Sequence, residues 1–154
     1  MRRTAAFCGL LDFKTYYFSY ANYGHPSQYL FHLNGSKIEH LAAQNTLLGI
    51  LPDGLHHEGK IAFEPGDRLL LFTDGVIEAA DSVGNAYGES RLMDFLRDHD
   101  GLEGDRFNKK LVEDLTRFRN DAFTDDIYIL NIKTKPRRMA ANENGREYAE
   151  KNSA

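Results

Sequence analysis

The sequence predicts an α+β fold in which antiparallel strands come first and helices follow. Strand-length apolar and aromatic runs alternate with turn residues through the first forty positions. Two later segments carry apolar residues at helical spacing, and the short apolar run 127–132 predicts a closing strand. A chain of 154 residues can bury roughly two-thirds of its unfolded surface, which is enough for one domain with its own core.

Four strands are expected in the first forty residues. A turn at 12–15 separates the first two, and Asn34 with Gly35 separates the next two, because Asn-Gly accepts the positive φ angles of a tight hairpin. Consecutive strands joined by such short turns are antiparallel. The four segments are 5–11, 16–20, 28–33 and 36–41.

The remaining elements follow in chain order. A strand at 56–63 is expected to end in the turn 64–67, where Pro and Gly favour a chain reversal. The continuously apolar run 69–72 predicts a strand covered on both faces. Segments 89–99 and 105–120 each place apolar residues on one stripe and predict amphipathic helices.

Charge and composition exclude several classes of protein. There are 19 basic and 23 acidic residues, for a net charge of −4. The stretch 134–154 carries five basic and three acidic residues, which leaves −6 on residues 1–133, so nucleic-acid binding is not expected. One cysteine excludes a disulfide framework, and no apolar run reaches the roughly 20 residues of a membrane span. We expect a cytoplasmic domain at 1–133 and a flexible polar tail at 134–154.

Isolated residues with reactive side chains have ordinary structural interpretations. Cys8 lies in an apolar strand and is expected to be a small core residue. His25 is expected to shape the turn that Gly24 and Pro26 form. His56 and His57 are neighbours on a predicted strand, so their side chains point to opposite faces and joint metal binding is not expected.

Two acidic sites stand out by their positions. Asp74 follows the strand 69–72, and Asp125 and Asp126 precede the strand 127–132. If these strands are adjacent and antiparallel, both sites reach the same edge of the sheet. Converging carboxylates favour a hard cation such as Mg²⁺ or Mn²⁺, and Gly75 would let the backbone approach it. The alternative is an ordinary Asp-Gly turn and a solvated Asp-Asp loop.

Five motifs resemble one known family in both order and spacing. They strongly resemble the SpoIIE/RsbU branch of the metal-dependent, PPM-type serine/threonine protein phosphatases over roughly residues 4–133. The motifs are 20–26 (YANYGHP), 48–53 (LGILPD), 65–79 (PGDRLLLFTDGVIEA), 87–92 (YGESRL) and 123–127 (FTDDI).

The resemblance implies a fold, a metal centre and a reaction. The fold is an αββα sandwich of two antiparallel sheets flanked by helices, with two Mg²⁺ or Mn²⁺ ions at one end. Asp74 and Asp125 correspond to metal ligands and hence to the catalytic residues, whereas Gly75 and Asp126 occupy supporting positions. The implied chemistry is hydrolysis of phosphoserine or phosphothreonine by a metal-activated hydroxide. By the same resemblance, the substrate is a phosphorylated regulatory protein such as an anti-sigma-factor antagonist.

One family motif is missing from this chain. The family's motif set begins upstream with an Asp and a Gly-His-Gly turn, and the Gly24-His25-Pro26 segment is a different element. The chain therefore resembles the carboxyl-terminal portion of the domain, incomplete at its N-terminus. Three hypotheses remain open: a partial phosphatase domain, a non-catalytic interaction module, and a site completed by another polypeptide or by exchange between protomers in a homodimer.

Overall fold

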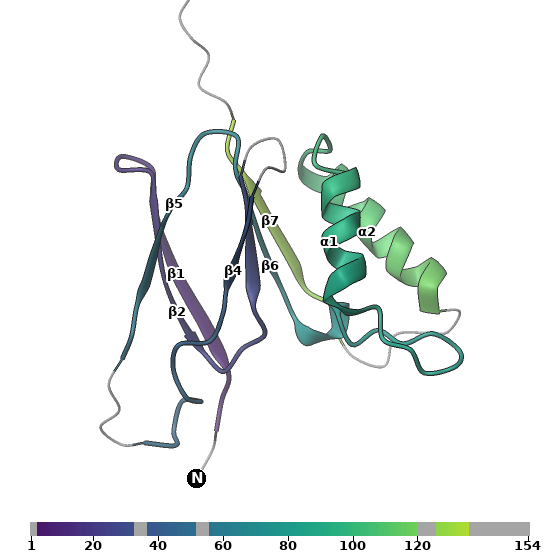
Figure 1. Cartoon of the computed structure of the whole chain (residues 1–154), viewed down its shortest axis with the longest axis horizontal. Coiled ribbons are helices and arrows are strands. Elements are labelled where there is room, and N and C mark those ends of the chain that lie inside the picture. The colour runs from purple at the N-terminus through teal and green to yellow at the C-terminus, as the bar shows by residue number, and fades with distance from the viewer. Residues whose placement is uncertain (1–2, 33–36, 52–55, 120–125, 136–154) are drawn as a thin grey trace, which may run out of the picture.

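The computed structural model describes residues 3–32, 37–51, 56–119 and 126–135. Two antiparallel sheets and two helices make up the described chain, as the sequence and the resemblance predict, and Figure 1 shows them as layers. The elements are β1 (Ala6–Asp12), β2 (Tyr17–Tyr23), β3 (Gln28–Phe31), β4 (Ile38–Leu41), β5 (Gly59–Ala62), β6 (Arg68–Phe72), α1 (Gly88–Asp98), α2 (Gly104–Arg119) and β7 (Ile129–Lys133).

The first sheet has three strands in the order β1-β2-β5. A tight turn joins β1 to β2, and the carboxylate of Asp12 holds it by accepting hydrogen bonds from the Lys14 N–H (2.8 Å) and the Thr15 hydroxyl (2.7 Å). Tyr16 completes the turn at a φ of 56°, a conformation uncommon for a residue other than glycine. The predicted hairpin between 5–11 and 16–20 is confirmed.

The second sheet has four strands in the order β4-β3-β6-β7. The predicted pairing of 28–33 with 36–41 is confirmed by the antiparallel register of β3 and β4, although Asn34 and Gly35 lie outside the described residues. Strand β6 lies inside the sheet and is mostly buried, as its continuous apolar run predicts. Strands β2 and β3 are consecutive in the chain but belong to different sheets, because β3 pairs with β6 and β2 with β5.

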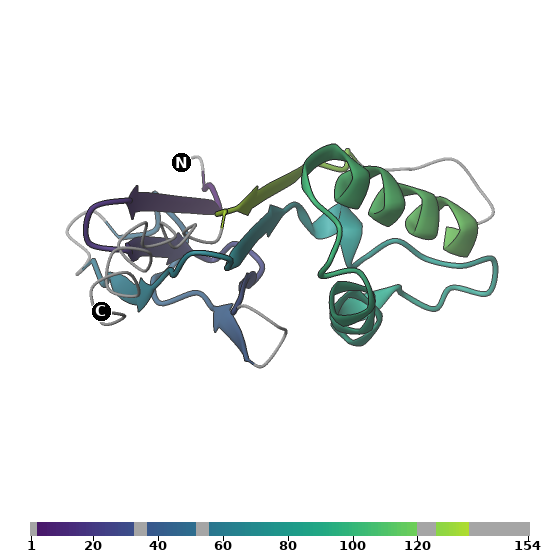
Figure 2. The same ribbon diagram turned by 90° about the horizontal axis from the view of Figure 1, so that it is seen from above.

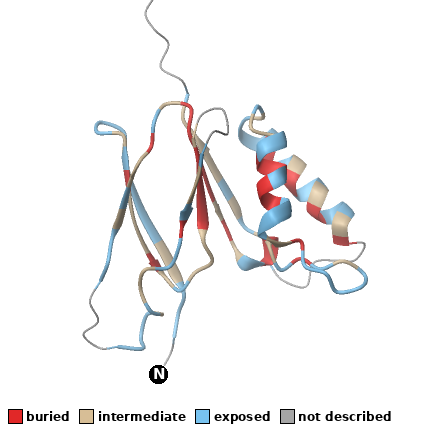
Figure 3. Ribbon diagram, viewed as in Figure 1, coloured by how far each residue is buried: buried red, intermediate tan, exposed pale blue. Residues whose placement is uncertain are grey.

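The helices form a layer on one face of the four-stranded sheet (Figure 1). Their apolar stripes, red in Figure 3, pack with one face of β3 and β6 in a large core. Its most buried members include Tyr29, Leu70, Val76, Leu92, Leu96, Phe107, Leu111 and Leu115. Among the described residues, no helix covers the three-stranded sheet.

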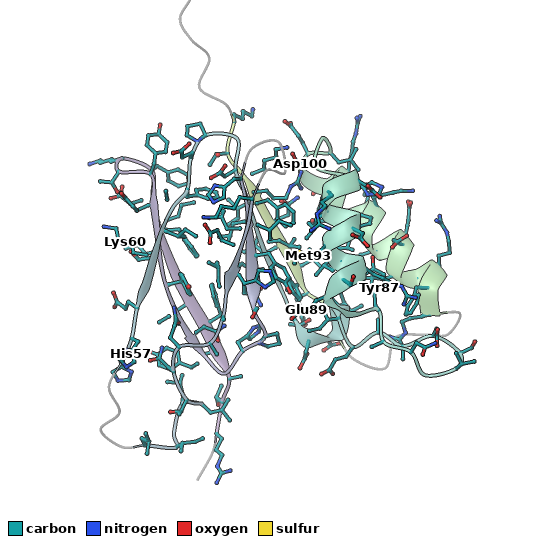
Figure 4. The ribbon with its side chains drawn as sticks, viewed as in Figure 1. His57, Lys60, Tyr87, Glu89, Met93 and Asp100 are labelled. Carbon is teal, nitrogen blue, oxygen red and sulfur yellow. The ribbon has the colours of Figure 1, made fainter. Side chains whose placement is uncertain are left out.

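A buried arginine connects the helix layer to the start of β6. Arg68 is 1% exposed, and its Nη2 donates to the carbonyl oxygens of Asp100 (2.8 Å) and Leu102 in the loop between α1 and α2. Its guanidinium lies 4.0 Å from the ring centroid of Phe107, and the Lys133 ammonium also donates to the Asp100 carbonyl at 2.6 Å. Asp100 lies at the top of the helix layer in Figure 4.

A smaller core lies between the two sheets. Its buried members are Phe18, Leu30, Leu41, Phe63 and Leu69. The prediction that Cys8 is a core residue is wrong, because Cys8 is exposed. The strand alternates, so Phe7 and Leu11 contact this core while Cys8 and Leu10 lie on the opposite, uncovered face.

A search of the described residues finds no candidate for a membrane-spanning helix. Most of the predicted tail at 134–154 lies outside the described residues, so the boundary between domain and tail stays a prediction.

Candidate metal-binding edge

The end of β6 and the start of β7 meet at one edge of the four-stranded sheet. The two strands pair antiparallel, with Phe72 opposite Ile129. Thr73 extends this pairing: its N–H donates to the Tyr128 carbonyl (3.2 Å), and its hydroxyl accepts from the Tyr128 N–H and donates to the Asp126 carbonyl, both at 3.1 Å. The adjacent, antiparallel arrangement on which the predicted meeting of the two acidic segments depends is therefore confirmed, and Asp74 follows directly on the residue that bonds to Asp126.

Asp74 lies at the surface in a hydrogen-bonded turn. It opens a short 3₁₀ helix, Asp74–Val76, whose other two residues are buried. The Asp74 carbonyl accepts from the N–H groups of Ile77 and Glu78, both at 2.9 Å. Its carboxylate Oδ1 accepts from the Gly75 N–H at 3.0 Å, while the residue itself is exposed. The side chain therefore has oxygen lone pairs available to a ligand from solvent.

The described carboxylates match a metal centre in chemistry but fall short in number. Asp74 and Asp126 offer hard oxygen donors, which suit Mg²⁺ or Mn²⁺. Asp125, the second predicted ligand, lies outside the described residues. Within residues 3–32, 37–51, 56–119 and 126–135, no group of three His, Cys, Asp or Glu side chains could hold a metal ion. The described carboxylates alone therefore do not make up a complete centre.

A hollow opens beside this edge, between the two sheets. Its volume is ≈ 340 Å³. Apolar side chains dominate its wall, and His25, Gln28 and Thr73 add polar groups. The lining residues are Phe7, His25, Gln28, Leu71, Phe72, Thr73, Tyr128, Ile129 and Leu130.

Gln28 positions the strand end that leads to Thr73 and Asp74. It is 1% exposed, and its Oε1 accepts from the Phe72 N–H (2.6 Å) while its Nε2 donates to the Phe72 carbonyl (3.2 Å). The same Nε2 donates to the Pro26 carbonyl at 2.8 Å. Gln28 thus joins the turn at 24–26 to the end of β6. This role was not predicted from the sequence, although a glutamine opening an otherwise apolar strand is a detectable signal.

The turn that carries His25 is built around a second buried polar side chain. Asn22 is 0% exposed; its Oδ1 accepts from the His25 N–H (2.9 Å), and its Nδ2 donates to the Leu41 carbonyl (3.1 Å). The interpretation of His25 as a turn residue agrees with these bonds. His56 and His57 are both exposed.

The segment after Asp74 is tied to the helix layer. The Tyr87 hydroxyl donates to the Asp114 carboxylate of α2 at 2.7 Å, and burial, followed by this bond, raises the pKa of Tyr87. The loop that precedes Tyr87 is held together by Asp81, whose carboxylate accepts hydrogen bonds from the Asn85 N–H (2.8 Å) and from the Asn85 side chain (2.9 Å). Figure 4 shows Tyr87 and Glu89 near the start of α1.

Comparison with known families identifies the class of protein. The model of the Stage II sporulation protein E (SpoIIE) family matches residues 2–135. The chain therefore belongs to the SpoIIE family, a group of PP2C-type, metal-dependent phosphatase domains. Among curated proteins, Protein IcfG of Synechocystis sp. (strain ATCC 27184 / PCC 6803 / Kazusa) is 32% identical over 91 residues, which are 58% of this chain and 14% of that protein.

Solved structures share the fold. The SiaA-PP2C domain of Pseudomonas aeruginosa superposes with a TM-score of 0.75 at 24% identity, covering 86% of this chain and 52% of that one. The RsbU and RsbW domains of Rv1364c from Mycobacterium tuberculosis give 0.71 at 23% identity, with 85% and 36% coverage. The Mn-presoaked SpoIIE phosphatase domain of Bacillus subtilis gives 0.63 at 16% identity, with 86% and 57% coverage.

The chain spans only part of these relatives. It covers about half of the SiaA domain structure and a seventh of Protein IcfG. The shared fold is that of a PP2C-type domain, of which these residues form one portion.

Proposed function

We propose that this chain is the carboxyl-terminal portion of a metal-dependent serine/threonine protein phosphatase domain. Asp74 and Asp125 are its metal ligands and catalytic residues, and Gly75 and Asp126 support them. Membership of the SpoIIE family supports the class of activity. The observation that carries the site is the β6–β7 contact through Thr73, which brings the Asp74 and Asp126 positions to one edge.

The described residues have separable tasks in this proposal. Gln28 and Thr73 hold the end of β6 against its neighbours, so the Asp74 turn keeps a defined position. Asp74 presents a solvent-facing carboxylate. When bound, Mg²⁺ or Mn²⁺ ions supply an activated water and neutralise phosphate oxygens. Because the described carboxylates are too few for such a centre, the proposal assigns the remaining ligands to Asp125 and to residues beyond the described ranges.

The proposed substrate is a phosphoserine on a small cytoplasmic regulatory protein of the anti-sigma-factor antagonist type. The match to the RsbU and RsbW domains of Rv1364c, which occur together in one chain, supports a regulatory setting. The hollow beside the metal-binding edge offers apolar surface and the polar groups of His25 and Thr73 to residues flanking a phosphoserine.

The decisive experiment measures Mn²⁺-dependent phosphate release from a phosphoserine protein. Wild type is compared with Asp74→Asn and with Asp98→Asn, an exposed aspartate at the end of α1. We expect Asp74→Asn to abolish release and Asp98→Asn to leave it unchanged. If the wild-type chain is inactive, the assay is repeated on a chain extended upstream. Phosphate release by that longer chain that Asp74→Asn does not reduce would contradict the proposal.

A non-catalytic interaction module is the second candidate. The observation that favours it is the lack of a three-ligand group in the described ranges. Calorimetry with Mn²⁺ separates the two candidates, because a phosphatase portion binds the ion through Asp74 while an interaction module does not. Binding that is lost in Asp74→Asn but kept in Asp98→Asn would support the metal site without requiring turnover.

A further inference from the structure

The connection between β2 and β3 is the segment in which the chain passes from one sheet to the other. Figure 2 shows both sheets on one side of the molecule and the two helices on the other. The connection carries His25, whose backbone N–H donates to Oδ1 of the fully buried Asn22 at 2.9 Å. The half-buried ring of His25 places its Nδ1 atom 3.1 Å from Nε2 of Gln28, the residue that joins this connection to the end of β6.

The side-chain amide of Gln28 has more acceptors within reach than it has hydrogens. Its orientation is fixed, because the Phe72 N–H can only donate and lies 2.6 Å from Oε1. The Nε2 group carries two hydrogens. Three acceptors lie within hydrogen-bond distance of Nε2: the carbonyl oxygens of Pro26 (2.8 Å) and Phe72 (3.2 Å), and Nδ1 of His25 (3.1 Å). Gln28 can therefore donate to only two of these three atoms.

The hydrogen on Nδ1 of His25 decides which two acceptors Gln28 serves. A bare Nδ1 accepts a hydrogen from Gln28 and competes with the Phe72 carbonyl, which is the longest of the three contacts. An Nδ1 that carries its own hydrogen cannot accept one, and it donates instead to the Pro26 carbonyl, 3.2 Å away. Both hydrogens of Gln28 then go to the Pro26 and Phe72 carbonyls, so every polar atom in this set has a partner.

The burial of Gln28 favours the arrangement in which no atom is left without a partner. Gln28 is 1% exposed, and an unpaired polar atom away from water destabilises the fold. With Nδ1 of His25 protonated, Gln28 holds Phe72 at both its N–H and its carbonyl oxygen. Phe72 is followed by Thr73 and Asp74, so this double contact fixes the strand end from which the Asp74 turn begins.

We propose that His25 is a positioning residue for the metal-binding edge and that it acts through Gln28. Its Nδ1–H donates to the Pro26 carbonyl, which leaves both amide hydrogens of Gln28 for carbonyl oxygens. The contact with Phe72 then fixes the position of Asp74. The inference rests on the proposed function only in taking Asp74 as a metal ligand. Every contact that it uses joins described residues, and its central member, Gln28, is buried.

Nuclear magnetic resonance on the full chain tests the state of the ring without any substitution. Long-range proton–nitrogen correlation distinguishes ring nitrogens that carry a hydrogen from those that do not. We expect the neutral ring of His25 to carry its hydrogen on Nδ1, and the exposed His57 provides the reference signals. A neutral His25 whose hydrogen is on Nε2 would overturn the proposal.

Three substitutions separate the donor from the bulk of the ring. His25→Asn keeps an amide donor close to the position of Nδ1, His25→Asp puts an acceptor there, and His25→Leu offers neither. We expect the backbone amide signals of Thr73 and Gly75 to stay near their wild-type positions in His25→Asn and to shift in the other two. His57→Leu, at the exposed histidine labelled in Figure 4, is the matched control and should shift neither signal. Equal shifts in all three His25 variants would contradict the proposal.

A double-variant cycle tests the path through Gln28. Gln28→Met keeps the length of the side chain but removes its donor hydrogens. In that background His25→Leu should add no further shift at Gly75, because the effect of His25 reaches Asp74 through Gln28. A further shift as large as the one in the wild-type background would contradict this path. Circular dichroism confirms the folding of every variant, and the ring state in the wild-type chain decides the proposal if Gln28→Met unfolds.

Calorimetric titration with Mn²⁺ connects this positioning to the metal site. We expect His25→Leu to weaken Mn²⁺ binding roughly tenfold and His25→Asn to stay within about twofold of wild type, because groups that orient metal ligands affect affinity on this scale. Wild-type affinity in His25→Leu, where binding still depends on Asp74, would overturn the proposal. Wild type that binds no Mn²⁺, or binding that Asp74→Asn leaves intact, counts against the proposed function instead, and the amide signals without metal then decide the role of His25.

Discussion

The two hydrophobic cores of this molecule differ in how completely they are closed. Between the four-stranded sheet and the helices, the residues facing inward are almost all buried, as Figure 3 shows for α1 and α2. Between the two sheets, five residues are fully buried, and the side that borders β1 and β7 exposes Leu130 and Tyr128. The core under the helices is therefore closed, whereas the candidate metal-binding edge lies beside the core that is open on one side.

This difference shows which part of the described chain is open to additional strands. A closed core stabilises the fold by itself, but an open core with free strand edges invites further strands. The acidic edge lies at the end of the open side, so whatever covers that side also lies close to Asp74. Stability and function are thus expected to respond to different substitutions.

The largest expected effect is on the closed core. Leu111→Ala removes a fully buried side chain between α2 and the sheet and should lower the free energy of unfolding by about 2–5 kcal/mol. The matched change Leu130→Ala, on the open side, should cost no more than about 0.5 kcal/mol. Urea denaturation of both variants measures the contrast. Equal losses would mean that the open side is in fact covered in solution.

The next effect concerns the connection between β6 and the helix layer. Arg68→Ala removes the donor to the Leu102 carbonyl, leaves the Asp100 carbonyl with Lys133 as its donor, and removes the contact with Phe107. We expect a loss of about 3 kcal/mol in the free energy of unfolding. Arg106→Ala, an exposed arginine on α2, is the control and should change stability little. A small loss for Arg68→Ala would show that the helix layer docks without this arginine.

A smaller effect is expected at the contact between Tyr87 and Asp114. Tyr87→Phe removes one hydrogen bond of 2.7 Å and should cost about 1 kcal/mol in the free energy of unfolding. The pKa of Tyr87 is raised in the folded state, so its contribution is present below the ordinary tyrosine pKa and is lost as pH rises through the folded-state value. Wild type should therefore lose more stability than Tyr87→Phe in alkaline solution, which thermal unfolding across pH can measure.

The smallest effect is local to the loop at Asp81. Hydrogen bonds from the Asn85 side chain, and then from its backbone N–H, hold the pKa of Asp81 below the usual aspartate value. The stabilisation is present above the ordinary pKa and is lost as pH falls through the lowered one. Asn85→Ala should raise the pKa of Asp81, as followed by NMR titration. The pKa of Asp12, which the Thr15 hydroxyl lowers in a distant turn, is the internal control and should not move.

Much of the local structure was predictable because it depends on short-range patterns. The apolar stripes of 89–99 and 105–120 predicted helices that the structure places at Gly88–Asp98 and Gly104–Arg119. The buried run before Asp74 became the interior strand β6. Both hairpins in the first forty residues formed as expected. Each of these features is decided by residues that lie close to one another in the sequence.

For the site, the sequence predicted only that the two acidic segments lie next to each other. Placing Asp74 and Asp126 at one edge required that β6 and β7 pair, which the structure confirms. The roles of Gln28 and Asn22 were not foreseen, because their hydrogen bonds reach Phe72 and Leu41 across long chain separations. Periodicity carries no information about such contacts.

By itself, the sequence determined the element types, the hairpins, the acidic positions and, through its motifs, the SpoIIE family. Only the tertiary structure decided that β2 and β3 separate into different sheets, that Cys8 faces outward and that β1 is the outermost described strand of its sheet. The physical reason is the range of the interactions. Turn geometry and helical periodicity are local, whereas the choice of strand partner depends on which apolar faces can be buried together once the whole chain has folded.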